Sequence, residues 1–226
     1  MGILYIVATP IGNLEDISKR ALRILSEVDL ILCEDTRVTK ILLDRYEIKT
    51  PTLSYHQHSQ LKKIEEITRL LGDEKNLALV SDAGTPGISD PGNKLIAQLI
   101  TQVSPVQVAQ VTPVPGPSAL TAAASISGFP MDRFVFLGFP PVKKKRKKFF
   151  GEAISSKYPV IFFESKHRIL KTLQELTLLN KQLPLVVCRE LTKKFETVYR
   201  GSAKDILAEL AKDEIRGEFV VIIGNK

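Results

Sequence analysis

Short apolar runs alternate with helix-like patterns along the first half of the sequence. The runs expected to form strands are LYIVA (4–8), LILCED (30–35), TLSYH (52–56) and NLALVSD (76–82). Apolar residues recur at helical spacing near residues 16–27, 36–46, 60–71 and 93–102. This alternation, with strands that are almost continuously apolar, is typical of a parallel sheet covered by helices on both faces. We therefore expect an α/β domain with a mostly parallel sheet.

The pattern changes in the second half. Strands are expected at 134–139, 159–165, 184–191, 196–202 and 218–224, separated by two clear helices. The short gap between residues 191 and 196 predicts a hairpin, so the second α/β domain should have a mixed sheet. Three prolines at 113, 115 and 117 stiffen the connection. We place the two domains at residues 1–114 and 115–226.

Four of the expected strands run into loops rich in glycine and proline: TPIGN (9–13), DAGTPGISDPG (82–92), PVPGPSA (113–119) and GFPP (138–141). In open α/β sheets, ligands bind outside the carboxyl ends of the strands. A single such loop simply ends a strand, but four together favour a rigid ligand site. Asp82 could accept hydrogen bonds from a ligand or cap a turn, and Gly84 and Gly116 could permit close approach or positive φ. The 82–92 loop lacks the spacing and lysine of phosphate-binding loops.

Positive charge is concentrated in one segment. The chain has 226 residues, 44% of them hydrophobic, and a formal net charge of +7. The run KKKRKK supplies six of these charges, from Lys143, Lys144, Lys145, Arg146, Lys147 and Lys148. Taken alone, such a run is typical of a solvated loop. Because it follows the strand and turn FLGFPP, we expect it to bind a polyanion, such as the phosphates of an RNA.

Several classes of protein are disfavoured. No apolar run approaches the about 20 residues that cross a bilayer, and the amino terminus lacks the pattern of a signal peptide. A cytoplasmic protein without membrane contact is expected. Cys33 and Cys188 lie in apolar runs, which indicates buried, reduced thiols, and their spacing from the three histidines predicts no metal site.

A set of motifs carries a family resemblance. In chain order they are LYIVATPIGNLEDIS (4–18), EDTR (34–37), SDAGTPGISDPG (81–92), PGPSA (115–119), DRFVFLGF (132–139), FFESKHR (162–168) and RELTK (189–193). Together they span nearly the whole chain, which resembles the ribosomal RNA small subunit methyltransferase I family of the tetrapyrrole-methylase-like fold. Related tetrapyrrole methylases carry a glycine-rich first loop, whereas Ala8, Thr9 and Pro10 stand here, so the resemblance is to the rRNA branch.

The resemblance implies two α/β domains of the class III methyltransferase type, with S-adenosylmethionine in the cleft between them. It also implies methylation of the ribose 2′-oxygen of a cytidine in the decoding region of 16S rRNA, by a homodimer. Matched motif by motif, the implied cofactor-binding residues are Pro10, Ile11, Gly12, Asp82, Ala83, Gly84, Thr85, Ile88, Pro115, Gly116, Ser118, Ala119 and Leu191, with Glu164 contributed by the second domain.

Methylation of a ribose hydroxyl requires alignment of the two reactants and removal of a proton. Candidates for the general base are Asp35, His56, His58, Glu164 and Glu190. The cations Arg37, Lys166, Arg168 and Arg189 could bind phosphate, or be exposed charges paired with neighbouring carboxylates. Glu164 and Arg189 are favoured as catalytic residues because they lie at strand ends. The alternatives are a small-molecule tetrapyrrole methylase and a non-catalytic RNA-binding assembly factor.

Overall fold

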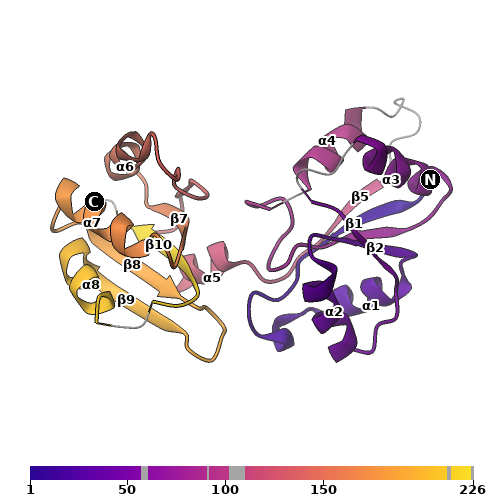
Figure 1. The fold of residues 1–226 in the computed structure, drawn as a ribbon, viewed down its shortest axis with the longest axis horizontal. Coiled ribbons are helices and arrows are strands. Elements are labelled where there is room, and N and C mark those ends of the chain that lie inside the picture. The colour runs from indigo at the N-terminus through magenta and orange to yellow at the C-terminus, as the bar shows by residue number, and fades with distance from the viewer. Residues whose placement is uncertain (57–60, 91, 102–109, 213–214, 225–226) are drawn as a thin grey trace. The chain divides into compact units, whose positions relative to one another are not determined.

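The computed structural model describes residues 1–56, 61–90, 92–101, 110–212 and 215–224 (Figure 1). Its contacts divide the chain into two compact units, Met1–Ser118 and Ala119–Lys226, which we name unit 1 and unit 2. The boundary expected from the sequence lies at 114/115. In the structure, residues 115–118, which follow the last strand of the first sheet, group with unit 1.

Unit 1 contains a five-stranded sheet in the order β3-β2-β4-β1-β5, and all its strand pairs are parallel. The strands are β1 (Ile3–Val7), β2 (Leu30–Cys33), β3 (Thr52–Ser54), β4 (Leu77–Leu79) and β5 (Gln110–Val114). The 3-10 turn η1 (Leu14–Asp16) precedes the helices α1 (Lys19–Glu27), α2 (Thr36–Arg45), α3 (Leu61–Gly72) and α4 (Asn93–Thr101). The predicted parallel α/β architecture is confirmed.

Two hydrophobic cores cover the sheet of unit 1. Alternate strand residues such as Val7 and Ile31 pack with α1 and α2, whereas Leu4 and Leu77 pack with α3 and α4. The chain leaves β1 toward β2 and leaves β4 toward β5, so these adjacent strands feed connections that run in opposite directions. Such a point opens a ligand crevice at the carboxyl ends of the strands.

Unit 2 contains a second five-stranded sheet in the order β6-β7-β10-β8-β9. Its strands are β6 (Val135–Phe136), β7 (Val160–Ser165), β8 (Pro184–Arg189), β9 (Thr197–Ser202) and β10 (Glu218–Ile223). Only the β6–β7 pair among these is parallel. The sheet is therefore mixed, and β8 and β9 form the predicted antiparallel hairpin.

The sequence predicted two helices in unit 2, fewer than the structure contains. The described part of this unit has four, namely α5 (Ala119–Ile126), α6 (Arg146–Ser155), α7 (Ile169–Leu179) and α8 (Ala203–Leu210). Helix α6 begins inside the basic run, which was considered as a loop. It buries Arg146, Phe150 and Ala153 on one face, and the Phe150 ring contacts Phe162 of β7 with centroids 5.9 Å apart. Packing on the sheet thus stabilises a helix that the charged sequence does not predict.

Both cysteines are buried and carry free thiols, as predicted. Burial raises the pKa of Cys188 to about 11, so its thiol stays protonated. Across the described residues, no helix combines the length and the apolar character of a membrane span.

Candidate functional site

The loops after β1 and β4 are joined directly. The backbone N–H of Thr9 donates to the carbonyl of Gly84 at 2.9 Å, and the N–H of Gly84 donates to the carbonyl of Thr9 at 3.0 Å. The Thr9 hydroxyl also donates to the carbonyl of Ser81 at 3.1 Å. Thr9 and Ser81 are both buried and escaped the sequence-based selection. Their signal was a hydroxyl residue directly after an apolar strand.

The loop after β5 reaches the same place. The Thr85 hydroxyl donates to the carbonyl of Pro117 at 3.3 Å. A Cβ atom on Gly116 would lie 3.1 Å from the Cβ of Ala8, so glycine permits the β5 and β1 loops to approach closely. Gly84 has a positive φ of 81°, and a Cβ atom there would lie 3.4 Å from Cγ2 of Ile11. Three of the loops selected from the sequence therefore form one structure at the carboxyl edge of the sheet.

The predicted cofactor-binding residues of these loops form a buried group and an exposed group. Pro10, Ile11 and Gly84 are buried, and Thr85 and Ser118 are half-buried. The exposed members are Gly12, Asp82, Ala83, Ile88, Pro115 and Gly116. The surface thus offers backbone groups, an apolar side chain and one carboxylate. Such a surface could bind a ligand that combines an apolar ring with hydroxyl or ammonium donors.

Asp82 connects this surface to the end of β2. Its Oδ1 atom accepts a hydrogen bond from the backbone N–H of Asp35 at 3.1 Å. Asp35 in turn caps α2 by accepting from the N–H of Arg37. The Arg37 guanidinium, which donates to the same carboxylate at 2.6 Å, lowers the pKa of Asp35 to about 2. Asp35 therefore stays ionised and engaged with Arg37, which makes it a poor general base.

Glu34 and His56 lie in the same electrostatic environment. Burial first, and then the negative charges of Asp82 and Asp35, raise the pKa of Glu34, while the charge of His56 acts in the opposite direction. His56 is exposed and follows β3. The structure thus brings His56, Glu34 and Asp82 to the carboxyl edge formed by β3, β2 and β4. His58 lies outside the described residues.

Glu164 of β7, which was expected to be catalytic, is enclosed within unit 2. Its side chain is 0% exposed, and Arg168 lies 2.9 Å from its Oε1 atom. The other oxygen accepts a hydrogen bond from the Thr172 hydroxyl at 2.6 Å. These contacts favour a structural role for the carboxylate. The catalytic role of Glu164 stays a prediction.

The segment after β8 carries the other residues predicted in unit 2. Arg189 donates from Nε to the carbonyl of Arg216 at 3.0 Å. The Glu190 carboxylate accepts from Lys193 at 2.9 Å and from the Glu218 N–H at 3.0 Å. Although burial opposes them, these bonds hold the pKa of Glu190 below its ordinary value.

Leu191, also after β8, is buried, and Ala119 begins α5. The contacts with Lys193 and Glu218 hold Glu190 in a structural position. The catalytic role of Arg189 stays a prediction.

The basic run divides into exposed and buried members. Lys143, Lys144, Lys145, Lys147 and Lys148 are exposed. Arg146 is buried, and its guanidinium pairs with Glu175 at 2.8 Å and donates to the Thr172 hydroxyl at 2.7 Å. Its donors are satisfied inside the unit, so the proposal of RNA binding below rests on the five exposed lysines. A lone arginine among lysines was the available signal, since guanidinium groups suit buried ion pairs.

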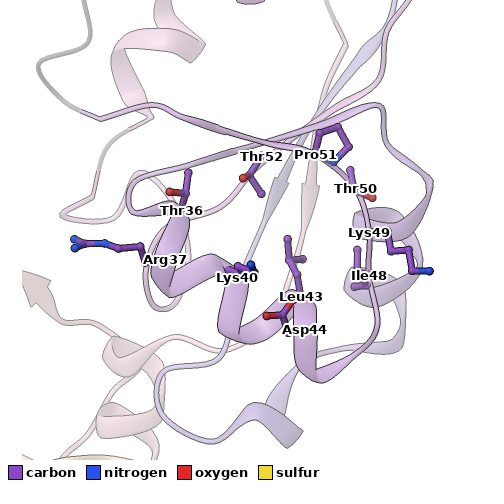
Figure 2. Close-up of a pocket in the computed structure, with 10 residues that line it drawn as sticks. All are labelled: Thr36, Arg37, Lys40, Leu43, Asp44, Ile48, Lys49, Thr50, Pro51 and Thr52. Atoms are coloured by element: carbon purple, nitrogen blue, oxygen red, sulfur yellow. The ribbon is translucent and has the colours of Figure 1, made fainter.

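A groove with a volume of about 470 Å³ lies elsewhere in unit 1, along α2 and the segment that leads into β3 (Figure 2). Its cations are Arg37, Lys40 and Lys49, accompanied by Asp44. None of the predicted cofactor-binding residues lines it.

The fold and the sequence define a class of enzyme. The sequence pattern of the tetrapyrrole (corrin/porphyrin) methylases matches residues 3–207. Among solved structures, a uroporphyrin-III C-methyltransferase from Thermus thermophilus, complexed with S-adenyl homocysteine, superposes with a TM-score of 0.65. It shares 18% identity, and the match covers 99% of this chain and 97% of that one. The class is that of the S-adenosylmethionine-dependent methyltransferases with the tetrapyrrole methylase fold.

Relatives in sequence narrow this class. The Thermotoga maritima protein named ribosomal RNA small subunit methyltransferase I is 43% identical over 226 residues, covering 100% of both chains. The Bacillus subtilis protein of the same name is 42% identical over 224 residues, covering 99% of this chain and 75% of that protein. The chain belongs to the ribosomal RNA small subunit methyltransferase I family. The resemblance found in the motifs is confirmed, and a non-catalytic assembly factor does not fit this membership.

Proposed function

We propose that the protein transfers a methyl group from S-adenosylmethionine to the ribose 2′-oxygen of a cytidine in the decoding region of 16S rRNA. The observation that carries the choice of substrate is similarity over the full chain to relatives named for the small ribosomal subunit RNA. The exposed lysines of unit 2 support it, because a polyanionic substrate gains affinity from clustered cations. A tetrapyrrole substrate remains the second candidate on the fold alone.

The cofactor fits the joined loops of unit 1. Gly116 is exposed and carries no side chain, so an adenine ring could lie against this edge of the sheet and bind to backbone N–H and carbonyl groups. The exposed carboxylate of Asp82 suits ribose hydroxyls or the ammonium group. When bound, S-adenosylmethionine supplies an electrophilic methyl group. The loops then serve to orient it, since alignment provides much of the acceleration of such a displacement.

We propose His56 as the general base. Asp35, Glu164 and Glu190 are each engaged by cations within their own unit. His56 is exposed at the carboxyl edge beside Glu34, and an imidazole nitrogen is a common acceptor of protons in catalysis.

Further proposals concern the setting of the reaction. The substrate is the assembled small ribosomal subunit or its free rRNA, and the enzyme acts in the cytoplasm as a homodimer. Sedimentation at several protein concentrations tests the dimer, which predicts a mass of twice 25.1 kDa.

The proposal is tested by methyl transfer from labelled S-adenosylmethionine to isolated 30S subunits, to naked 16S rRNA and to a tetrapyrrole precursor. Labelled 16S rRNA with an unlabelled tetrapyrrole is the expected result. Labelling of the tetrapyrrole alone would favour the second candidate. Comparison of the two RNA substrates then shows whether the enzyme requires the shape of the folded particle.

A further inference from the structure

The contacts of Glu164 extend to the segment that precedes the lysines. Besides Arg168 and Thr172, the carboxylate accepts a hydrogen bond from the backbone N–H of Ser165 at 2.8 Å. The Arg146 guanidinium lies 3.9 Å from Oε2, and the Thr172 hydroxyl, which donates to Glu164, accepts from Arg146 in turn. One buried carboxylate thus orients two arginines, directly and through a shared hydroxyl.

Each of these arginines also holds a proline carbonyl. Arg168 donates from Nη1 to the carbonyl of Pro140 at 3.0 Å. Arg146 donates from Nη1 to the carbonyl of Pro141, also at 3.0 Å. Proline has no backbone N–H, so the carbonyl is the only hydrogen-bonding group that these two residues offer. The two arginines therefore bind this segment through both proline carbonyls, and only Val142 separates Pro141 from Lys143.

Charge within this cluster is balanced. Glu175 supplies the second carboxylate, at 2.8 Å from Arg146, so two arginines face two glutamates. The arginines consequently contribute little net field to the surface. Their guanidinium forks can bridge an acid and a carbonyl at once, which a lysine ammonium does with less geometric control. The arrangement suits fixing of backbone rather than attraction of RNA.

The held segment needs such fixing. Lys145 has a left-handed backbone with φ of 69°, a conformation that a lysine adopts uncommonly. Its side chain makes no capping hydrogen bond to α6. External contacts on both sides, at Pro140, Pro141 and Arg146, therefore maintain a backbone that the lysines alone would not favour.

We propose that Glu164 is a positioning residue whose two arginine partners clamp the Pro140 and Pro141 carbonyls and thereby hold the lysines at 143–145 ready for RNA. This inference rests on the proposed function of the basic run. A segment that is ordered before binding loses less conformational entropy when it engages phosphates, so the clamp raises affinity without adding a charge contact. Removal of lysines and loosening of the clamp should therefore have different signatures.

The test uses the full-length enzyme with Arg168→Lys, which keeps the charge beside Glu164 but loses the fork that reaches Pro140. Binding to 16S rRNA is measured at several salt concentrations. We expect about fivefold weaker binding from the lost ordering, with the slope of log K against log salt unchanged. The loss should appear in KM for RNA, with the dissociation constant for S-adenosylmethionine at its wild-type value.

Thr172→Val tests the other arm of the clamp, because it removes the hydroxyl shared by Glu164 and Arg146 at nearly constant volume. Arg133→Lys is the matched control, since Arg133 contacts Tyr158 and neither proline. All measurements are made below the unfolding temperature of each variant. Weaker RNA binding in both clamp variants but not in the control supports the inference.

Wild-type RNA affinity in both folded clamp variants would overturn it, as would a reduced salt slope, which indicates lost phosphate contacts instead. Failure of the proposed function looks different. In that case the lysines at 143–145 would contribute nothing to the salt dependence of RNA binding by the wild-type protein.

Discussion

Neutralising the exposed lysines of the basic run should abolish a defined part of the salt dependence of RNA binding. The change replaces Lys143, Lys144, Lys145, Lys147 and Lys148 by Gln and leaves the buried Arg146 in place. Each cation that neutralises a phosphate of single-stranded RNA contributes about 0.7 to the slope, so five contribute about 3.5. Lys148 counts because its pairing with Glu152 at 3.7 Å is exposed and stabilises little.

The predicted slope has a practical consequence. Between 50 and 200 mM salt, a contribution of about 3.5 weakens wild-type binding about 100-fold. Fluorescence anisotropy with a labelled fragment of 16S rRNA measures this directly. The neutralised variant should lose about 3.5 from the slope, while calorimetry shows unchanged affinity for S-adenosylmethionine.

A matched control removes the same number of charges elsewhere on unit 2. It replaces five other exposed lysines by Gln: Lys157, Lys171, Lys181, Lys204 and Lys212. If both variants lower the slope equally, the effect comes from net charge and the assignment of the run is refuted. Equal loss of RNA and cofactor binding in the first variant would also refute it, since that outcome indicates damage to the fold.

Three further predictions concern unit 1. His56→Gln should lower kcat at least about 100-fold, as expected for a lost general base, with unchanged cofactor affinity; a loss smaller than about threefold would exclude that role. Gly116→Val should weaken S-adenosylmethionine binding in calorimetry, because its Cβ would lie 3.1 Å from that of Ala8; wild-type affinity would remove this loop from the site. Arg37 lowers the pKa of Asp35 to about 2. The stabilisation of the folded protein by this pair is therefore complete above the pKa of aspartate in the unfolded chain, and it is lost as pH falls toward 2. The difference in Tm between wild type and Asp35→Asn should therefore narrow from pH 5 downward, and a constant difference would contradict this cause.

The parts of the fold that the sequence predicts are those with local signals. The apolar runs at 4–8 and 30–35 became β1 and β2 because near-continuous apolar residues are buried on both faces of a parallel sheet. The β8–β9 hairpin followed from the short polar gap between two such runs. Glycine and proline after β1, β4 and β5 marked the loops that the structure joins, through the Thr9–Gly84 bridge and the hydrogen bond from Thr85 to Pro117.

The parts that the sequence does not predict depend on partners far along the chain. Arg146 resembles its lysine neighbours until Thr172 and Glu175, well removed in sequence, are seen to enclose it. Glu164 has the residue type and the strand-end position expected of a general base, but its carboxylate is enclosed by Arg168 and Thr172. Neither arrangement has a periodicity that could reveal it, because both arise from the packing of α6 and α7 on β7.

The central claim is methylation of a ribose oxygen, and alkaline hydrolysis of the labelled RNA product tests it most directly. Alkali cleaves RNA through the free 2′-hydroxyl, so a methyl group on that oxygen protects the adjacent phosphodiester bond. We predict that the label is recovered in an alkali-stable dinucleotide that begins with cytidine. Recovery of the label in a mononucleotide would place the methyl group on a base and contradict the account.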